Sequence, residues 1–216
     1  MAKVRRLSLK PAIPLINKKA LYSINWNTKN LQGDYKSKII KKLDKIYDNI
    51  SQYILNTGLK GLVYYNTFDV RKDGDCIVFT DHDLRWTLPR IKNRCIADSV
   101  EENKKIALQI VTLGNKITDI YDKLEEDDLF SLSYYFHGFT VWLTDALADH
   151  HHDILHQENN LTKARERYSF GYPLCPDLNM QKDLFNLLEL DETSEVKLTE
   201  SFMMMPEQST SAIIIL

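Results

Sequence analysis

The longest regular pattern in this chain is helical, and it constrains the fold more than any other feature. Between Leu129 and Gln157, apolar side chains recur at the three- and four-residue spacing that places them on one face of a helix. The members of this face are Leu132, Tyr135, Phe136, Phe139, Leu143, Ala146, Leu147 and Ile154. A helix with so long an apolar face needs a second layer to cover it, so the rest of the chain must supply one.

Shorter patterns predict that layer. Ser37 as an N-cap and Gly58 as a stop bound another amphipathic helix. The turn Lys72-Asp73-Gly74 joins two predicted strands into a hairpin. The predicted strands are Leu62–Phe68, Cys76–Thr80, Lys105–Leu113, Val196–Met204 and Ser209–Leu216, and the remaining helices are Ile117–Leu124 and Met180–Leu190, with a connecting segment at Leu84–Cys95.

Together these elements predict an α+β fold in which helices pack on an antiparallel sheet. The first 20 residues are basic and punctuated by proline, and we expect an N-terminal arm over residues 1–20. No linker composition divides the remainder, so we expect a single domain over residues 21–216.

Composition excludes several functional classes. The 216 residues carry a net charge of −2, which argues against a nucleic-acid partner. No apolar run is long enough to span a bilayer, and the basic N-terminus lacks a signal-peptide core, so we expect no membrane partner. The three cysteines, Cys76, Cys95 and Cys175, are widely spaced and form no CxxC pair. That pattern indicates a reducing, cytoplasmic location rather than a disulfide framework.

The densest functional segment is Arg167-Tyr-Ser-Phe-Gly-Tyr-Pro-Leu-Cys-Pro-Asp177. The guanidinium of Arg167 can pair with a carboxylate through two hydrogen bonds. Gly171 permits a close backbone approach or a positive φ, and the ring of Tyr172 can lie on a flat or cationic group. Two prolines stiffen the loop around these residues.

A second dense segment, Lys197-Leu-Thr-Glu-Ser-Phe-Met-Met-Met-Pro206, follows downstream. The two segments in this order resemble the Arg-x-x-x-Gly-Tyr-Pro-x-Cys-Pro and Leu-Thr-Glu-Ser-Phe-x-Met-x-Pro motifs of the activation domain of cobalamin-dependent methionine synthase. Weaker matches at Ile24-Asn25-Trp26 and Cys95-Ile-Ala-Asp98 extend the resemblance over nearly the whole chain. The resemblance implies that family's α+β fold and a shallow groove for S-adenosylmethionine.

The resemblance also implies roles for individual residues. Arg167 would hold the carboxylate of S-adenosylmethionine, and the backbone of Tyr168 and Gly171 would make close contacts to the ligand. Tyr172 would be the catalytic residue, placed near the transferred methyl group and the cobalamin face. Asp149 would hold the cationic part of the ligand, although the family usually has Glu there.

Two further positions are carried over from the family. Asn25 stands where the family usually has Asp, so the expected cofactor-binding residue here lacks one negative charge. Asp145 matches an aspartate that faces the corrinoid partner. No general base is needed, because methyl transfer to a reduced cobalt moves no proton, and catalysis would consist of positioning.

The function implied is a repair reaction on cobalamin-dependent methionine synthase. A flavodoxin-like donor reduces the inactive cob(II)alamin, and S-adenosylmethionine then supplies the methyl group. This chain has no Asp-x-His-x-x-Gly motif for cobalamin, so the cobalamin must be carried by a partner protein. We therefore expect a reactivation subunit acting on a separate methionine synthase. The alternatives are a reactivation factor for another corrinoid methyltransferase and a non-catalytic binding module that has lost the ligand.

A histidine-rich helix offers one competing interpretation. Asp145, Asp149, His152 and His156 share one face of the long helix, and His152 and His156 have the i, i+4 spacing of zinc ligands. No HExxH pattern accompanies them. A solvated or interface surface is the commoner explanation of such a face, so we expect no metal.

Overall fold

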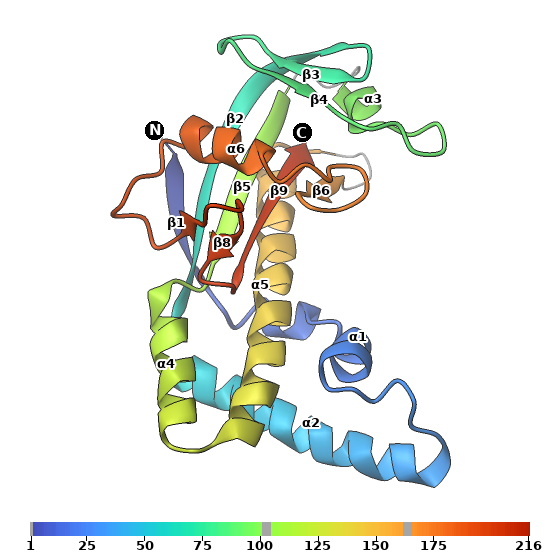
Figure 1. Ribbon diagram of the computed structural model, residues 1–216, viewed down its shortest axis with the longest axis vertical. Coiled ribbons are helices and arrows are strands. Elements are labelled where there is room, and N and C mark those ends of the chain that lie inside the picture. Colours follow the sequence, from blue (N-terminus) through green and yellow to red (C-terminus); the bar gives the residue numbers. More distant parts are fainter. Residues whose placement is uncertain (1, 101–104, 162–165) are drawn as a thin grey trace.

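A computed structural model describes residues 2–100, 105–161 and 166–216 (Figure 1). Within these residues, seven strands form one antiparallel sheet in the order β4-β3-β2-β5-β9-β6, with β1 paired to β2. Its strands are β1 Lys3–Ser8, β2 Lys60–Asp73, β3 Cys76–Phe79, β4 Arg85–Thr87, β5 Lys105–Thr112, β6 Arg167–Ser169 and β9 Ser209–Ile215. A small separate hairpin pairs β7 Lys197–Leu198 with β8 Met204–Met205.

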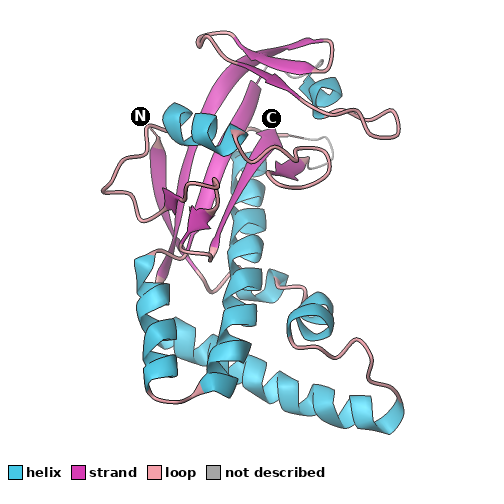
Figure 2. Ribbon diagram, viewed as in Figure 1, coloured by secondary structure: helices cyan, strands magenta, loops and turns pink. Residues whose placement is uncertain are grey.

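Helices pack around this sheet (Figure 2). The longest is α5, Phe130–Glu158, and the other long helix, α2 (Gly33–Asn56), lies across its lower end in Figure 1. The remaining bounds are α1 Lys18–Ala20, α3 Ile96–Val100, α4 Asn115–Glu126 and α6 Met180–Leu187, with a 3-10 turn at Ile13–Leu15 and a π-helical turn at Leu21–Asn25. The α+β prediction of helices on an antiparallel sheet is confirmed.

Strand β5 is buried on both faces, because it lies between β2 and β9 at the centre of the sheet. Ala107 and Val111 join the core under α5 and α2, whereas Ile106, Leu108 and Ile110 join a second core on the opposite face. The near-continuous apolar run of this strand follows from that position. The sheet therefore separates two hydrophobic cores.

Helix α5 packs closely on the sheet, which fixes the position of its exposed face. Phe139, Leu143 and Leu147 are fully buried in the core between this helix and the strands. Leu147 lies directly against Gly61 of β2, where a Cβ atom would have no room. Glycine at this position therefore permits the close approach of helix and strand.

Local structure differs from expectation in the first 20 residues and at the start of α2. Residues 3–8, expected in an N-terminal arm, pair with β2 along the sheet. Ser37 is not an N-cap, because α2 begins at Gly33 and the Ser37 hydroxyl donates to the Gly33 carbonyl at 3.5 Å. The acidic Asp34 in the first turn favours this earlier start.

The predicted strand Val196–Met204 is wrong. A turn divides it into β7 and β8, with Phe202 at a φ of 60°. Thr199 closes this turn, because its N–H donates to the Met203 carbonyl at 2.8 Å and its carbonyl accepts from Phe202 N–H at 3.0 Å. In the described residues, no helix is both long and apolar enough to cross a membrane.

Candidate functional site

The Gly-Tyr-Pro segment forms a tight turn directly after β6. The Gly171 N–H donates to the Cys175 carbonyl, and the Cys175 N–H donates to the Tyr172 carbonyl, both at 2.8 Å. Gly171 has a φ of +83°, a conformation that L side chains rarely adopt. The turn leaves Tyr172 67% exposed while it buries Cys175 completely. Burial raises the pKa of the Cys175 thiol to about 12, so this cysteine is a packing residue rather than a nucleophile.

A groove of about 460 Å³ runs beside this turn. One wall comes from α5, through Trp142 and Asp145, and the turn contributes Gly171 and Tyr172. The opposite wall comes from α6, β9 and the turn between β7 and β8. Its members include Gln181, Met203, Met204, Thr210 and Ser211. The groove thus combines the carboxylates of Asp145 and Glu207 with the apolar side chains of Trp142 and the two methionines.

Arg167 is held by two aspartates of α5. Its Nη2 lies 3.0 Å from Asp145 Oδ1 and 2.9 Å from Asp149 Oδ1. The two aspartates are four residues apart and so share one face of the helix. Arg167 is largely buried, with 13% of its side chain exposed, whereas each aspartate is about half exposed. Burial raises the pKa of Asp149 despite the opposing charge of Arg167.

Arg167 and Asp149 also line a second hollow of about 420 Å³. Leu15, His152 and Asp153 complete its lining. Asp145, in contrast, lines the main groove, so its ion pair with Arg167 connects the two spaces. Of the predicted site residues, the structure therefore places Asp145, Gly171 and Tyr172 in the groove, whereas Arg167 and Asp149 line the second hollow and reach the groove through the ion pair with Asp145.

Asn25 stands behind the groove wall rather than in it. Its Oδ1 accepts a hydrogen bond of 2.7 Å from Trp142 Nε1, and Trp142 lines the groove. The Tyr134 hydroxyl also donates to the main-chain carbonyl of Asn25. Asn25 thereby orients the indole ring that lines the groove.

Tyr168 points its side chain away from Arg167, as successive residues of a strand do. Its hydroxyl donates to Glu166 at 2.9 Å and lies 3.4 Å from the Ser99 hydroxyl. Its main chain pairs with Ile213 of β9. A ligand role for the Tyr168 backbone remains a prediction.

The histidine-rich part of α5 serves packing. His151 is fully buried, its Nδ1–H donates to Gln109 Oε1 at 2.7 Å, and its ring meets the Tyr65 ring edge-on. Burial lowers the pKa of His151 to about 3, so it stays neutral. His152 is also buried, whereas Asp145 and Asp149 on the same helix face are about half exposed, so this face is only partly a solvated surface. Within the described ranges, no group of three or more His, Cys, Asp or Glu residues could hold a metal ion.

Sequence reasoning missed several groove residues. Trp142 was one aromatic among many on a long helix, and Gln181 was one polar residue in a short one. Met203 and Met204 lay inside the second motif, which carried the only available signal for them. Their joint position depends on the turn between β7 and β8, which the pattern did not predict.

Fold and groove together define a class: an α+β domain whose groove offers a small molecule both charged and apolar side chains. A family model described as the vitamin B12 dependent methionine synthase activation domain matches residues 67–216. The match covers more than half of the chain. This chain therefore belongs to the family of methionine synthase activation domains.

Individual relatives agree with this assignment. Methionine synthase of Mycobacterium tuberculosis is 29% identical over 192 residues, covering 71% of this chain and 16% of that protein. Methionine synthase of Mycobacterium leprae is 28% identical over the same length and coverage. The chain thus spans about one sixth of the length of these curated relatives.

A solved structure shares the fold. The crystal structure of the MetH reactivation domain bound to AdoHcy matches with a TM-score of 0.74 at 19% identity. The match covers 100% of this chain and 78% of that one. The similarity extends the fold assignment to residues 2–66, which lie before the family match.

Proposed function

We propose that this chain binds S-adenosylmethionine in the groove and supports reductive methylation of cob(II)alamin on a separate methionine synthase. The observation that carries the proposal is the ion-paired cluster of Arg167, Asp145 and Asp149, which connects the groove with the second hollow. Family membership and a structural neighbour described as bound to AdoHcy support the same ligand class.

The charges of the cluster complement this ligand. Two carboxylates and one guanidinium give a net charge of −1. S-adenosylmethionine has a carboxylate, an ammonium and a sulfonium, which sum to +1. Arg167 Nη2 makes both ion pairs, while Nη1 makes a long contact of 3.5 Å with Ser169 Oγ. A contact of that length is readily exchanged for a ligand carboxylate, so the aspartates orient the guanidinium and can receive the cations.

The groove also suits the ligand in size and polarity. Its volume of about 460 Å³ lies in the range of small-molecule sites. Trp142 and the two methionines provide apolar surface for the nucleoside. The exposed Tyr172 stands at the mouth, where a partner would approach. When bound, S-adenosylmethionine supplies an electrophilic methyl group, and this chain's residues bind and orient it without moving a proton.

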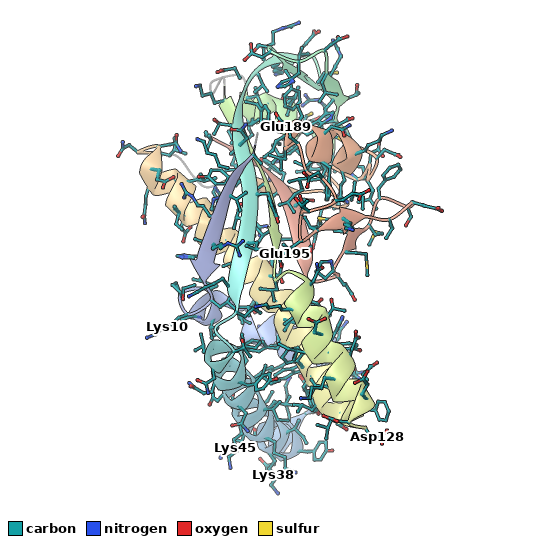
Figure 3. The ribbon with its side chains drawn as sticks, turned by 90° about the vertical axis from the view of Figure 1, so that its left-hand side faces the viewer. Lys10, Lys38, Lys45, Asp128, Glu189 and Glu195 are labelled. Carbon is teal, nitrogen blue, oxygen red and sulfur yellow. The ribbon has the colours of Figure 1, made fainter. Side chains whose placement is uncertain are left out.

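An electron donor must also approach this assembly. Residues 1–60 contain thirteen Lys and Arg and three Asp, a net of +10, although the whole chain has a net charge of −2. Part of this charge lies on α2, where five exposed lysines outnumber the three aspartates Asp34, Asp44 and Asp48; the lysines are Lys36, Lys38, Lys41, Lys42 and Lys45. Figure 3 shows Lys38 and Lys45 pointing outward from this helix. We assign this basic face to an acidic surface of the flavodoxin-like donor, since complementary charge speeds association.

Reconstitution tests the proposal. Purified chain is mixed with a separately produced methionine synthase holding cob(II)alamin, a flavodoxin-like reductant and methyl-labelled S-adenosylmethionine. Synthase activity should return only when all components are present, with label on the corrinoid. No recovery with an active reductant would contradict the reactivation role. If activity returned only with a different corrinoid methyltransferase, the proposed ligand would stand and the proposed partner would be wrong.

A matched pair of variants tests the donor assignment. Lys38→Glu with Lys45→Glu should slow recovery at low salt, and the difference should shrink as salt rises. Changing Lys116 and Lys182, exposed lysines outside α2, to Glu alters the net charge equally and serves as the control. Equal slowing by both pairs would remove α2 from the docking surface.

A further inference from the structure

Gln181 is a buried glutamine that uses both ends of its amide. It lies in the first turn of α6 and is 3% exposed. Its Nε2 donates to the Phe202 carbonyl at 2.9 Å, and its Oε1 accepts from the Ser211 hydroxyl at 3.0 Å. A buried polar atom without a hydrogen-bond partner destabilises the folded state. An amide whose N–H and oxygen both have partners therefore holds those partners in defined positions.

The three connected segments all border the groove. Gln181 and Ser211 line it directly, and Phe202 immediately precedes the lining residues Met203 and Met204. Phe202 has a positive φ of 60°, and the turn is otherwise closed by bonds within Thr199–Met203. The amide of Gln181 therefore links this turn to α6 and β9.

We propose that Gln181 is a positioning residue of the groove, which holds the turn so that Met203 and Met204 form the wall for the uncharged nucleoside part of the ligand. The inference rests on the proposed binding of S-adenosylmethionine. It separates two tasks: the Arg167 cluster binds the amino-acid end, and Gln181 sets the shape of the opposite end. Gln181 acts through the methionines and does not itself react.

Isosteric substitutions test this role. Gln181→Met keeps the side-chain length and removes both hydrogen bonds, so affinity for S-adenosylmethionine should fall roughly 3- to 10-fold at any pH. Gln181→Glu should behave differently. A protonated Glu can donate to the Phe202 carbonyl and accept from Ser211, whereas an ionised Glu only accepts and repels that carbonyl.

The predicted signature is therefore pH-dependent rescue. Burial raises the pKa of a carboxyl group, so Glu at this position gains its proton at a higher pH than usual. Affinity of Gln181→Glu should approach that of the parent near pH 5.5 and fall to that of Gln181→Met near pH 8. Lys182→Gln changes the exposed next residue on α6 and should match the parent throughout.

Calorimetric titration with S-adenosylmethionine at both pH values measures these affinities, and circular dichroism confirms folding of each variant. Methyl NMR of labelled methionines follows Met203 and Met204 without ligand, and both signals should move in Gln181→Met. Parent-like affinity of Gln181→Met, or equal loss for Gln181→Glu at both pH values, would overturn the inference. Failure of the parent to bind would overturn the proposed function instead. Even in that case, Met203 and Met204 signals that did not move in ligand-free Gln181→Met would overturn the positioning role of Gln181.

Discussion

Replacement of Arg167 by alanine should separate ligand binding from folding. A charge-assisted hydrogen bond to a ligand carboxylate is worth roughly 1.5–3 kcal/mol, so affinity for S-adenosylmethionine should fall about 10- to 100-fold. The remaining Asp145 and Asp149 would still attract the cationic groups of the ligand. For this reason weak binding should survive, and it should weaken further as salt rises.

The cost of the same change to folding should be smaller. Asp145 and Asp149 are about half exposed, and solvent-screened pairs of this kind contribute roughly 0.5–1 kcal/mol each. Without Arg167, these like charges also face each other one helical turn apart, which costs a few tenths of a kcal/mol. We expect the free energy of unfolding to fall by about 1–2 kcal/mol, leaving a folded protein.

Calorimetry measures the affinity, and urea unfolding measures the stability. Arg167→Lys is the informative control, because it keeps the charge but loses the planar guanidinium. Its affinity should lie between those of the parent and Arg167→Ala. Equal affinity of Arg167→Ala and the parent would refute the reasoning, as would an unfolding cost large enough to account for the loss of binding.

Three further changes follow from the structure. Asn25→Asp retains the acceptor for Trp142 and adds a negative charge behind the groove. Calorimetry should therefore show S-adenosylmethionine binding roughly 2- to 30-fold tighter at low salt. An unchanged affinity at both low and high salt would show that Asn25 does not belong to the site. His151 is neutral when folded, with its pKa lowered from 6.5 to about 3, so the unfolded chain binds more protons between these values. The free energy of unfolding should therefore fall by about 2 kcal/mol between pH 7.5 and pH 5 in urea titrations. His151→Gln should lose this pH dependence. If the variant kept the same pH dependence as the parent, the neutral state assigned to His151 would be wrong. Cys175, whose buried thiol has a pKa of about 12, should resist iodoacetamide at pH 8 until urea unfolds the protein, and rapid labelling of the folded protein detected by mass spectrometry would disprove its burial.

Local patterns predicted most of the framework, because the responsible forces act over a few residues. Apolar spacing indicated α5 to within one residue at each end, and the Lys72-Asp73-Gly74 turn correctly joined β2 to β3. Strand β1 was missed because three basic residues leave it without an apolar run, and its pairing with β2 joins positions more than fifty residues apart.

The site depended more heavily on tertiary structure. Helical spacing placed Asp145 and Asp149 on one face, and the motif singled out Arg167, but neither pattern could show that the arginine pairs with both aspartates. That contact arises because β6 joins the sheet beside β9 and so brings Arg167 to α5. The role of Gln181 could not be predicted from the sequence for the same reason, since its hydrogen-bond partners, Phe202 and Ser211, lie 21 and 30 residues away.

Titration of the purified protein with S-adenosylmethionine tests the central claim most directly. The charge-complementary cluster of Arg167, Asp145 and Asp149 predicts saturable binding of one ligand per chain. Binding should weaken as salt rises, and Arg167→Ala should reduce it. A flat titration with millimolar ligand, from protein shown to be folded, would contradict the account.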